Sequence, residues 1–288
     1  ALASERQWWE GLAERQFVSL PVDHPEGSND GSSIETVQVS LSEEETRLLL
    51  QEVPQAYRTQ INDVLLTALA QGVSAWSGSS DVLVDLEGHG REEILDGVDI
   101  SRTVGWFTSL FPVRFAVTGD LDEGAALKQV KEQLRQMPRR GVGFGLLRYL
   151  CEAPNVAEAI RGLPAPPIQF NYLGQFQQLF ASTPLFDPAP EPPGAFARVG
   201  AASQRRPYVL EVIGMVGDDR LKLMWHYSRN LHRRETVAAL ANEYMSRLRG
   251  LIVHCCSRKD REFTPSDFPL ANLDQQKLAK LAARLQAR

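Results

Sequence analysis

The residues best able to do chemistry lie in one stretch, residues 85–92 (DLEGHGRE), directly after the apolar run of residues 81–84 (DVLV). The apolar run predicts a strand, and the glycine after Glu87 predicts its end. A carboxylate at an apolar strand end, beside a residue without a side chain, has its pKa raised by burial and suits acid/base chemistry near neutral pH. The alternative is a polar strand exit with a solvated carboxylate.

A second polar pair ends another candidate buried strand, residues 168–172 (IQFNY), which Gly174 terminates. The hydroxyl of Tyr172 could donate to an enolate oxygen or relay a proton. The alternative, left open here, is a core aromatic whose hydroxyl finds a structural partner. We interpret Asn171 as structural, capping the strand end.

Three further residues near Glu87 are candidates for supporting roles. We expect His89 to organise the loop rather than to catalyse, and Arg91 to form a solvated ion pair with Glu92 or another carboxylate nearby. Trp106, with Phe107, is by residue type more often a core residue than a substrate contact.

The elements that must position these residues follow from periodicity, caps and turns. Helices are predicted at residues 4–16, 42–52, 61–76, 122–136 and 234–256, and strands at 34–41, 81–87, 110–117, 168–172, 208–216 and 221–227. Their interleaving indicates an α/β fold, a mixed β-sheet with packed helices. The alternating glycines of residues 141–145 lack both dinucleotide spacing and a preceding strand, so we reject a phosphate loop there.

Two segments are expected to face other surfaces. Residues 182–196 contain five prolines and predict an extended arm that reaches toward a neighbouring surface. Residues 274–288 predict a terminal helix with basic and leucine faces. We therefore expect one lobe over residues 1–269 and a linker or docking helix over residues 270–288.

The composition excludes several classes of protein. The chain has 288 residues, a net charge of -5 and three cysteines with neither metal-site nor disulfide spacing. We accordingly expect no metal, no nucleic-acid partner, no membrane span and a cytoplasmic location. The chain does not begin with methionine, which leads us to expect a piece of a longer polypeptide.

Five blocks in order carry a resemblance to a known family. They are residues 63–68 (DVLLTA), 87–92 (EGHGRE), 102–108 (RTVGWFT), 138–145 (PRRGVGFG) and 170–174 (FNYLG). With them the chain resembles the C-terminal half of an epimerization domain of a nonribosomal peptide synthetase, in the condensation-domain superfamily. Phe111 replaces a frequent tyrosine and Ala70 a frequent glycine. The family's His-His-x-x-x-Asp-Gly block is absent.

The resemblance implies one lobe of a two-lobed, chloramphenicol-acetyltransferase-like architecture. It implies an epimerase that inverts Cα from L to D in an aminoacyl or peptidyl thioester on a phosphopantetheine arm, with no directly bound cofactor. The implied partners are a peptidyl carrier protein, a missing N-terminal lobe with the histidine motif, and a downstream synthetase module. Glu87 would then face that histidine across a channel, with Trp106 near the channel floor.

Two other functions stay open. One is a non-catalytic, condensation-like module that binds carrier protein or a recruited partner; the sequence upstream of Ala1 would decide this. The other is a condensation or acyl-transfer domain, against which Glu87 argues because amide formation does not need it. If the protein is an epimerase, we expect the isolated chain to be inactive, with the pKa of Glu87 relaxing toward its ordinary value in water.

Overall fold

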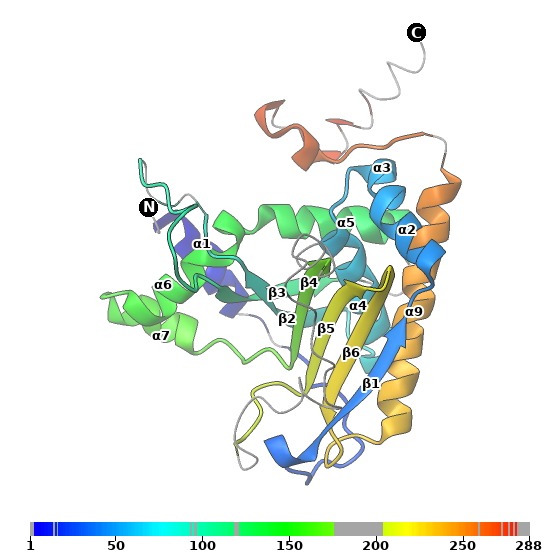
Figure 1. The fold of residues 1–288 in the computed structure, drawn as a ribbon. Coiled ribbons are helices and arrows are strands. Elements are labelled where there is room, and N and C mark those ends of the chain that lie inside the picture. Colours follow the sequence, from blue (N-terminus) through cyan, green and yellow to red (C-terminus); the bar gives the residue numbers. More distant parts are fainter. Residues whose placement is uncertain are drawn as a thin grey trace.

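A six-stranded sheet forms the centre of the molecule in the computed structural model (Figure 1). The structure describes residues 3–13, 15, 17–92, 94, 97–117, 121–175, 204–258, 260–271, 273–275, 277–278 and 280. The strands are β1 (Ile34–Ser40), β2 (Asp81–Gly88), β3 (Ser109–Ala116), β4 (Ile168–Gln175), β5 (Leu210–Gly217) and β6 (Arg220–Ser228). The longer helices are α1 (Ala3–Ala13), α2 (Glu43–Gln51), α4 (Ile61–Ser77), α5 (Glu123–Gln136), α6 (Val142–Leu150), α7 (Pro154–Arg161) and α9 (Arg234–Ser257).

The sheet is mixed, and its parallel strands are central. The order is β1-β6-β5-β4-β2-β3, in which β2, β4 and β5 run parallel and the remaining pairs are antiparallel. Strands β5 and β6 form the predicted hairpin, whose two turn residues, Asp218 and Asp219, both have positive φ (53° and 56°). The predicted α/β class with a mixed sheet and packed helices is confirmed.

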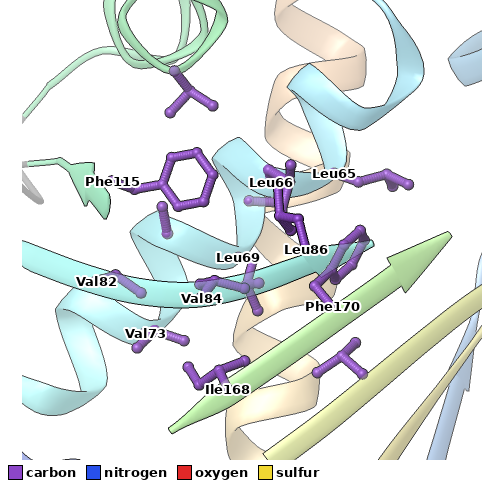
Figure 2. Packing of buried hydrophobic residues seen from close by; sticks show 14 of the residues in the cluster. Leu65, Leu66, Leu69, Val73, Val82, Val84, Leu86, Phe115, Ile168 and Phe170 are labelled. Atoms are coloured by element: carbon purple, nitrogen blue, oxygen red, sulfur yellow. The ribbon is translucent and has the colours of Figure 1, made fainter. Parts of the chain in front are cut away.

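The main core lies between the sheet and a helix layer that includes α4 and α9. Val82, Val84 and Leu86 alternate along β2 and point at the leucines of α4, as Figure 2 shows. Leu65, Leu66 and Leu69 of α4 are at most 1% exposed, as their spacing predicted. Because the even-numbered residues of β2 fill this core, its odd-numbered residues must face the other side of the sheet.

Caps fix the helix that supports β2. α4 begins with a capping box between Gln60 and Asp63 and ends at Gly78, which has the left-handed conformation (φ 73°). α2 begins with the predicted capping box of Ser42 and Glu45. These local signals explain why both helices were predictable from the sequence.

Three helices were not predicted. The short helix α3 (Val53–Tyr57) takes Pro54 in its first turn, where a proline breaks no hydrogen bond, so Pro54 does not stop the helical path as expected. α7 likewise opens on Pro154. α6 contains two glycines, which lower helix propensity, and it is held by packing against α7 and β3.

The first of the alternating glycines is required by packing. Gly141 has φ 81°, and a Cβ there would lie 2.2 Å from the Phe111 ring. It ends a short 3₁₀ helix, η2 (Pro138–Gly141), in which Arg139 and Arg140 also have positive φ (43° and 50°). This turn joins α5 to α6.

Two short 3₁₀ turns follow α9 near the C-terminus, η4 (Pro265–Asp267) and η5 (Pro269–Ala271). At the start of the predicted terminal helix, the Leu278 N–H donates to the Asp274 carbonyl at 3.0 Å, one helical turn. The boundary at residue 270 stays a prediction. The proline-rich arm of residues 182–196 and residues 281–288 lie outside the described residues. Within the described part, no helix is long and apolar enough to cross a membrane.

Candidate active site

Glu87 lies near the carboxyl end of β2, on the sheet face that the core helices leave open. Leu86 before it is 8% exposed and points into the core, whereas the Glu87 side chain is exposed. The strand runs parallel to β4, with Leu86 beside Phe170. The next position of the same register sets Asn171 beside Glu87.

Two amides from β4 hold the Glu87 carboxylate. The Gln169 Nε2 donates to Oε1 at 2.8 Å, and the Asn171 Nδ2 donates to Oε2 at 2.7 Å. The pKa of Glu87 is raised above its ordinary value by burial against the protein, and the hydrogen bond from Asn171 offsets part of that rise. This is the direction that the sequence predicts for a carboxylate at an apolar strand end.

Asn171 is thus not a strand-end cap, as the sequence interpretation had it. β4 continues to Gln175, so Asn171 is an internal strand residue whose side chain binds the neighbouring carboxylate. The error arose because β4 does not stop where the aromatic–glycine pattern suggested: Gly174 has φ 83° and lies within the strand.

Tyr172 lies with Glu87 in a pocket of about 290 Å³ at the carboxyl ends of β2 and β4. Burial raises the pKa of the Tyr172 hydroxyl, so it stays protonated at neutral pH. Within the described part of the chain the hydroxyl has no hydrogen-bond partner. It is therefore available as a donor, and the alternative of a structurally paired core hydroxyl has no support in the contacts.

A buried ion pair forms the opposite wall of this pocket. Arg135 of α5 donates two hydrogen bonds to the Asp63 carboxylate of α4, at 2.9 and 2.8 Å. The side chain of Asp63 is 1% exposed and also accepts from the Gln60 N–H at 2.7 Å. This bidentate pair fixes the start of α4 against the end of α5 and so shapes the pocket that Glu87 and Tyr172 line.

His89 organises its loop, as expected. Its Nδ1 accepts the Arg91 N–H at 3.0 Å, and its Nε2 lies 3.1 Å from Oε1 of Glu92. The same carboxylate oxygen lies 3.6 Å from Nη1 of Arg140. Both ring nitrogens of His89 are therefore engaged away from Glu87, although the residue lines the same pocket.

Arg91 does not form the solvated ion pair that we expected. Its Nη1 donates to the Ile100 carbonyl at 2.7 Å and its Nη2 to the Gly105 carbonyl at 3.1 Å. The guanidinium also lies 4.3 Å from the centroid of the Phe107 ring. Arg91 therefore ties the loop before β3 to the end of β2, because backbone carbonyls rather than carboxylates surround it.

Two neighbours in this loop complete its geometry. Gly90 has φ 67°, and a Cβ there would lie 1.5 Å from the Phe107 carbonyl oxygen, so only glycine fits. Trp106 is 90% exposed, which makes the expectation of a core residue wrong. An indole held in water in an exposed loop is a contact surface that this chain itself does not use.

The pocket residues Asp63, Arg135 and Arg140 were not predicted from the sequence, and neither was Gln169, which donates to Glu87. Asp63 carried a signal, since it stands three residues after Gln60 at a helix start. Gln169 and Arg135 carried none, because their roles depend on which strands and helices become neighbours. Among the described residues, no group of three His, Cys, Asp or Glu side chains is arranged to hold a metal ion.

The arrangement is suited to proton transfer. A carboxylate with a raised pKa can take a proton, and a phenol that lines the same pocket can donate a hydrogen bond to an oxygen that gains negative charge. Both groups lie near the carboxyl ends of parallel strands, where α/β sheets commonly bind ligands.

Comparison with known proteins assigns the family. The profile of the Condensation domain family matches residues 1–273, and the chain belongs to that family. It is 47% identical over 275 residues to a linear gramicidin synthase protein of Brevibacillus parabrevis, covering 95% of this chain and 5% of that protein. It is 44% identical to chondramide synthase of Chondromyces crocatus, covering 96% of this chain and 7% of that protein. The chain thus spans a small fraction of these relatives' length.

Solved structures of related domains can be compared with this chain. The epimerization domain from the third module of tyrocidine synthetase B superposes with a TM-score of 0.78 at 32% identity, covering 89% of this chain and 56% of that one. The condensation domain of a monacolin K polyketide synthase shares the fold, with a TM-score of 0.61 at 18% identity. The family likeness and the synthetase context stated on sequence grounds are confirmed.

Proposed function

We propose that this chain is the Glu87-bearing part of an epimerase that inverts Cα from L to D. Its substrate is an aminoacyl or peptidyl thioester on the phosphopantetheine arm of a carrier protein. The observation that carries the proposal is the Glu87 carboxylate, held by two amides in a pocket that the Tyr172 side chain also lines. The 32% identity to a solved epimerization domain supports the same reaction.

The proposed reaction is a transfer of protons alone, and it needs neither a redox partner nor a directly bound cofactor. A base removes the Cα proton, the thioester carbonyl becomes an enolate, and a proton returns to the opposite face of Cα. Glu87 exchanges a proton on its side of the substrate, and the Tyr172 hydroxyl donates to the enolate oxygen. The group on the other side is the histidine that the family resemblance places in a facing lobe. His89 does not fill that role, because both of its ring nitrogens are engaged.

The test uses the complete polypeptide that carries this sequence, with its carrier protein loaded with an L-aminoacyl thioester in D₂O. Glu87→Gln should slow deuterium incorporation at Cα by about 10²–10⁴-fold, since it removes a general acid/base, while loading is unchanged. Glu43→Gln, at an exposed surface ion pair, is the matched control and should exchange at the wild-type rate. Wild-type exchange in Glu87→Gln would refute the proposal.

Tyr172→Phe tests the second group in the same assay. Loss of a donor to the developing oxyanion should slow exchange by about 10²–10³-fold. A loss of less than about threefold would assign the Tyr172 hydroxyl to structure and leave Glu87 as the acid/base group of this chain.

A further inference from the structure

A second and larger pocket lies close to Glu87, next to its cross-strand neighbour on β3. We call it the β3 pocket: a cavity of about 840 Å³ between β3, α6, the loop that precedes β3 and the segments that lead into β4 and β5. Leu110, the cross-strand partner of Glu87 on β3, is 42% exposed and lines this pocket. Gln169 and Asn171 hold Glu87 from the opposite side. A substrate atom that meets the free edge of the Glu87 carboxylate therefore has the β3 pocket beside it.

The walls of the β3 pocket are apolar and rich in rings. Those that matter here are Phe107, Leu110, Pro112, Phe144, Tyr149 and Pro166. Tyr149 is 70% exposed although it is a large aromatic residue at the end of α6. Aromatic and proline rings offer flat faces and edges, against which another aromatic ring packs well. The volume lies in the range of pockets that bind small organic ligands.

One carboxylate that lines the pocket has a hydrogen-bond partner on only one of its two oxygens, within the described part of the chain. Asp85 is 8% exposed, and its Oδ2 accepts the Tyr208 hydroxyl at 2.9 Å. Its Oδ1 has no hydrogen-bond partner within the described part of the chain, and no lysine or arginine there forms an ion pair with it. Burial raises the pKa of Asp85 to about 6, and the hydrogen bond from Tyr208, followed by the charge of Arg148, offsets part of the rise. One oxygen of Asp85 is therefore still able to accept a hydrogen bond from a ligand.

The residues around Asp85 favour a ligand with a neutral hydrogen-bond donor over a ligand with a positive charge. Arg148 lines the same pocket, and its guanidinium lies 5.6 Å from the centroid of the Phe144 ring and 5.8 Å from that of Tyr149. A second positive charge beside Asp85 would be repelled by Arg148. A ring N–H or O–H gives Asp85 its hydrogen bond without that cost.

The distance between the carboxylates of Asp85 and Glu87 is similar to the length of one aromatic side chain of a substrate. Asp85 and Glu87 are two positions apart on one strand and so leave the same face of the sheet about 7 Å apart. An aromatic side chain spans a comparable distance from Cα to its polar ring atom. A substrate Cα at Glu87 would thus bring such a ring atom to Asp85.

We propose that the β3 pocket binds an aromatic side chain of the residue being epimerised, and that Asp85 accepts a hydrogen bond from its ring N–H or O–H. This inference rests on the proposed function, which supplies the position of Cα at Glu87. It assigns Asp85 and Tyr208 as residues that determine specificity, with Tyr208 orienting the carboxylate.

Two matched substrate pairs test the assignment in the complete polypeptide. The carrier is loaded with tyrosine or phenylalanine, and with tryptophan or 3-benzothienylalanine, in which sulfur replaces the ring N–H. The wild-type protein should exchange the Cα proton of the donor-bearing member at least about tenfold faster in each pair, because its partner leaves Asp85 unsatisfied. Asp85→Leu should bring both ratios to about one.

Two further variants guard against a folding artefact. Asp81→Asn, on the same strand at the ion pair with Arg114, is the control and should keep both wild-type ratios. Leu110→Trp should narrow the mouth of the β3 pocket and slow tyrosyl and tryptophanyl thioesters more than an alanyl thioester. If Asp85→Leu does not fold, the wild-type ratios and Leu110→Trp still decide the question.

A failure of the proposed function and a failure of the β3 pocket assignment give different results. If the wild-type protein exchanges no aminoacyl thioester, the proposed function itself is contradicted. If it exchanges them but both ratios are near one, or Asp85→Leu keeps the wild-type ratios, only the assignment of the β3 pocket is overturned. Faster exchange of leucyl than of tyrosyl thioester would also overturn it.

Discussion

Two opposed effects act on Glu87, and their balance sets the pH range in which it can serve as a base. Burial raises its pKa, and the hydrogen bond from Asn171 pulls it back. A fully buried carboxylate would be protonated at neutral pH, and a fully solvated one would be a weak base. The open edge of the site, together with the two amides, keeps Glu87 between these limits.

This balance predicts a shifted pH profile for Asn171→Leu. Removing the donor leaves burial unopposed, so the pKa of Glu87 rises further. The base is active when deprotonated, so activity is lost as pH falls through this pKa, and the acidic limb of the exchange-rate profile should move to higher pH. Rates measured from about pH 5 to 9 in the complete polypeptide check this. Gln38→Leu, an exposed amide on β1, should leave the limb in place; an unmoved limb in Asn171→Leu would contradict the assigned role of Asn171.

Residue types were enough to select Glu87 and Tyr172 as candidates, whereas the residues that contact them could not be predicted from the sequence. Glu87 is recognisable because an apolar strand and glycines surround it in the sequence. Gln169 is an ordinary strand residue until β4 becomes the parallel neighbour of β2. Asp85 likewise looks like one more polar residue at a strand end, and only the fold brings Tyr208 onto it.

At the scale of elements, the helices with strong local signals were predictable and those made by packing were not. α4 has a capping box, a periodic leucine stripe and a glycine cap, and its predicted range, residues 61–76, differs from the observed helix, Ile61–Ser77, only at its last residue. α6 has a glycine-rich sequence and exists because it packs beside α7 and β3. The loop before β3 is held by tertiary contacts of Arg91, which no local pattern encodes.

A buried ion pair fastens the segment after α9 to α5. Lys131 of α5 is 1% exposed, and its Nζ donates to both carboxylate oxygens of Asp267, each at 2.8 Å, and to the Tyr57 carbonyl at 2.8 Å. Asp267 also accepts the Thr264 N–H at 2.8 Å. Three elements, α3, α5 and η4, thus meet at one ammonium group.

Lys131→Met should therefore destabilise the domain strongly. The substitution keeps the apolar stem but leaves Asp267 buried without its cation, which costs about 3–5 kcal/mol in the free energy of unfolding. Lys128→Met is the matched control on the same helix. Its pair with Glu262 is 27% and 38% exposed, so the cost should stay within about 1 kcal/mol. Urea denaturation of the complete domain measures both, and equal losses would show that the Lys131 pair is not the main attachment.

At the scale of the whole molecule, the hydrophobic core and the candidate site occupy different parts of the sheet. One face buries the core against α4 and α9, and the carboxyl ends of β2 and β4 leave Glu87 and Tyr172 open at the pocket. Trp106 and Val104, 90% and 99% exposed, belong to the loop that precedes β3. Apolar side chains this exposed are typical of a surface that contacts another surface.

The sequence also led us to expect that, in the isolated chain, the pKa of Glu87 would relax toward its ordinary value. Contacts within this chain keep it above that value, so any relaxation is incomplete. The walls of the Glu87 pocket are sufficient for this effect, even against the opposing hydrogen bond from Asn171.

We still expect the 288-residue chain by itself not to epimerise a thioester, and the reason is the geometry of inversion. A proton must leave one face of Cα and return to the other, so two groups must flank the substrate. The pocket of Glu87 offers Tyr172, a phenol whose pKa is raised, and His89, whose ring nitrogens are both engaged. Neither is a free base, and this chain covers 56% of the solved epimerization domain.

Two measurements on the isolated chain test this expectation: deuterium exchange at Cα, and inversion of the configuration at Cα. Because Glu87 keeps its raised pKa, the chain alone could catalyse slow loss and return of the Cα proton from one face, seen as deuterium uptake in D₂O without a change of configuration. Chiral analysis after hydrolysis should therefore find no D-isomer above a protein-free control, with Glu87→Gln of the same chain as the reference for any uptake. Catalytic formation of the D-isomer would show that a second acid/base group lies within this chain, and Tyr172 would be the first to test.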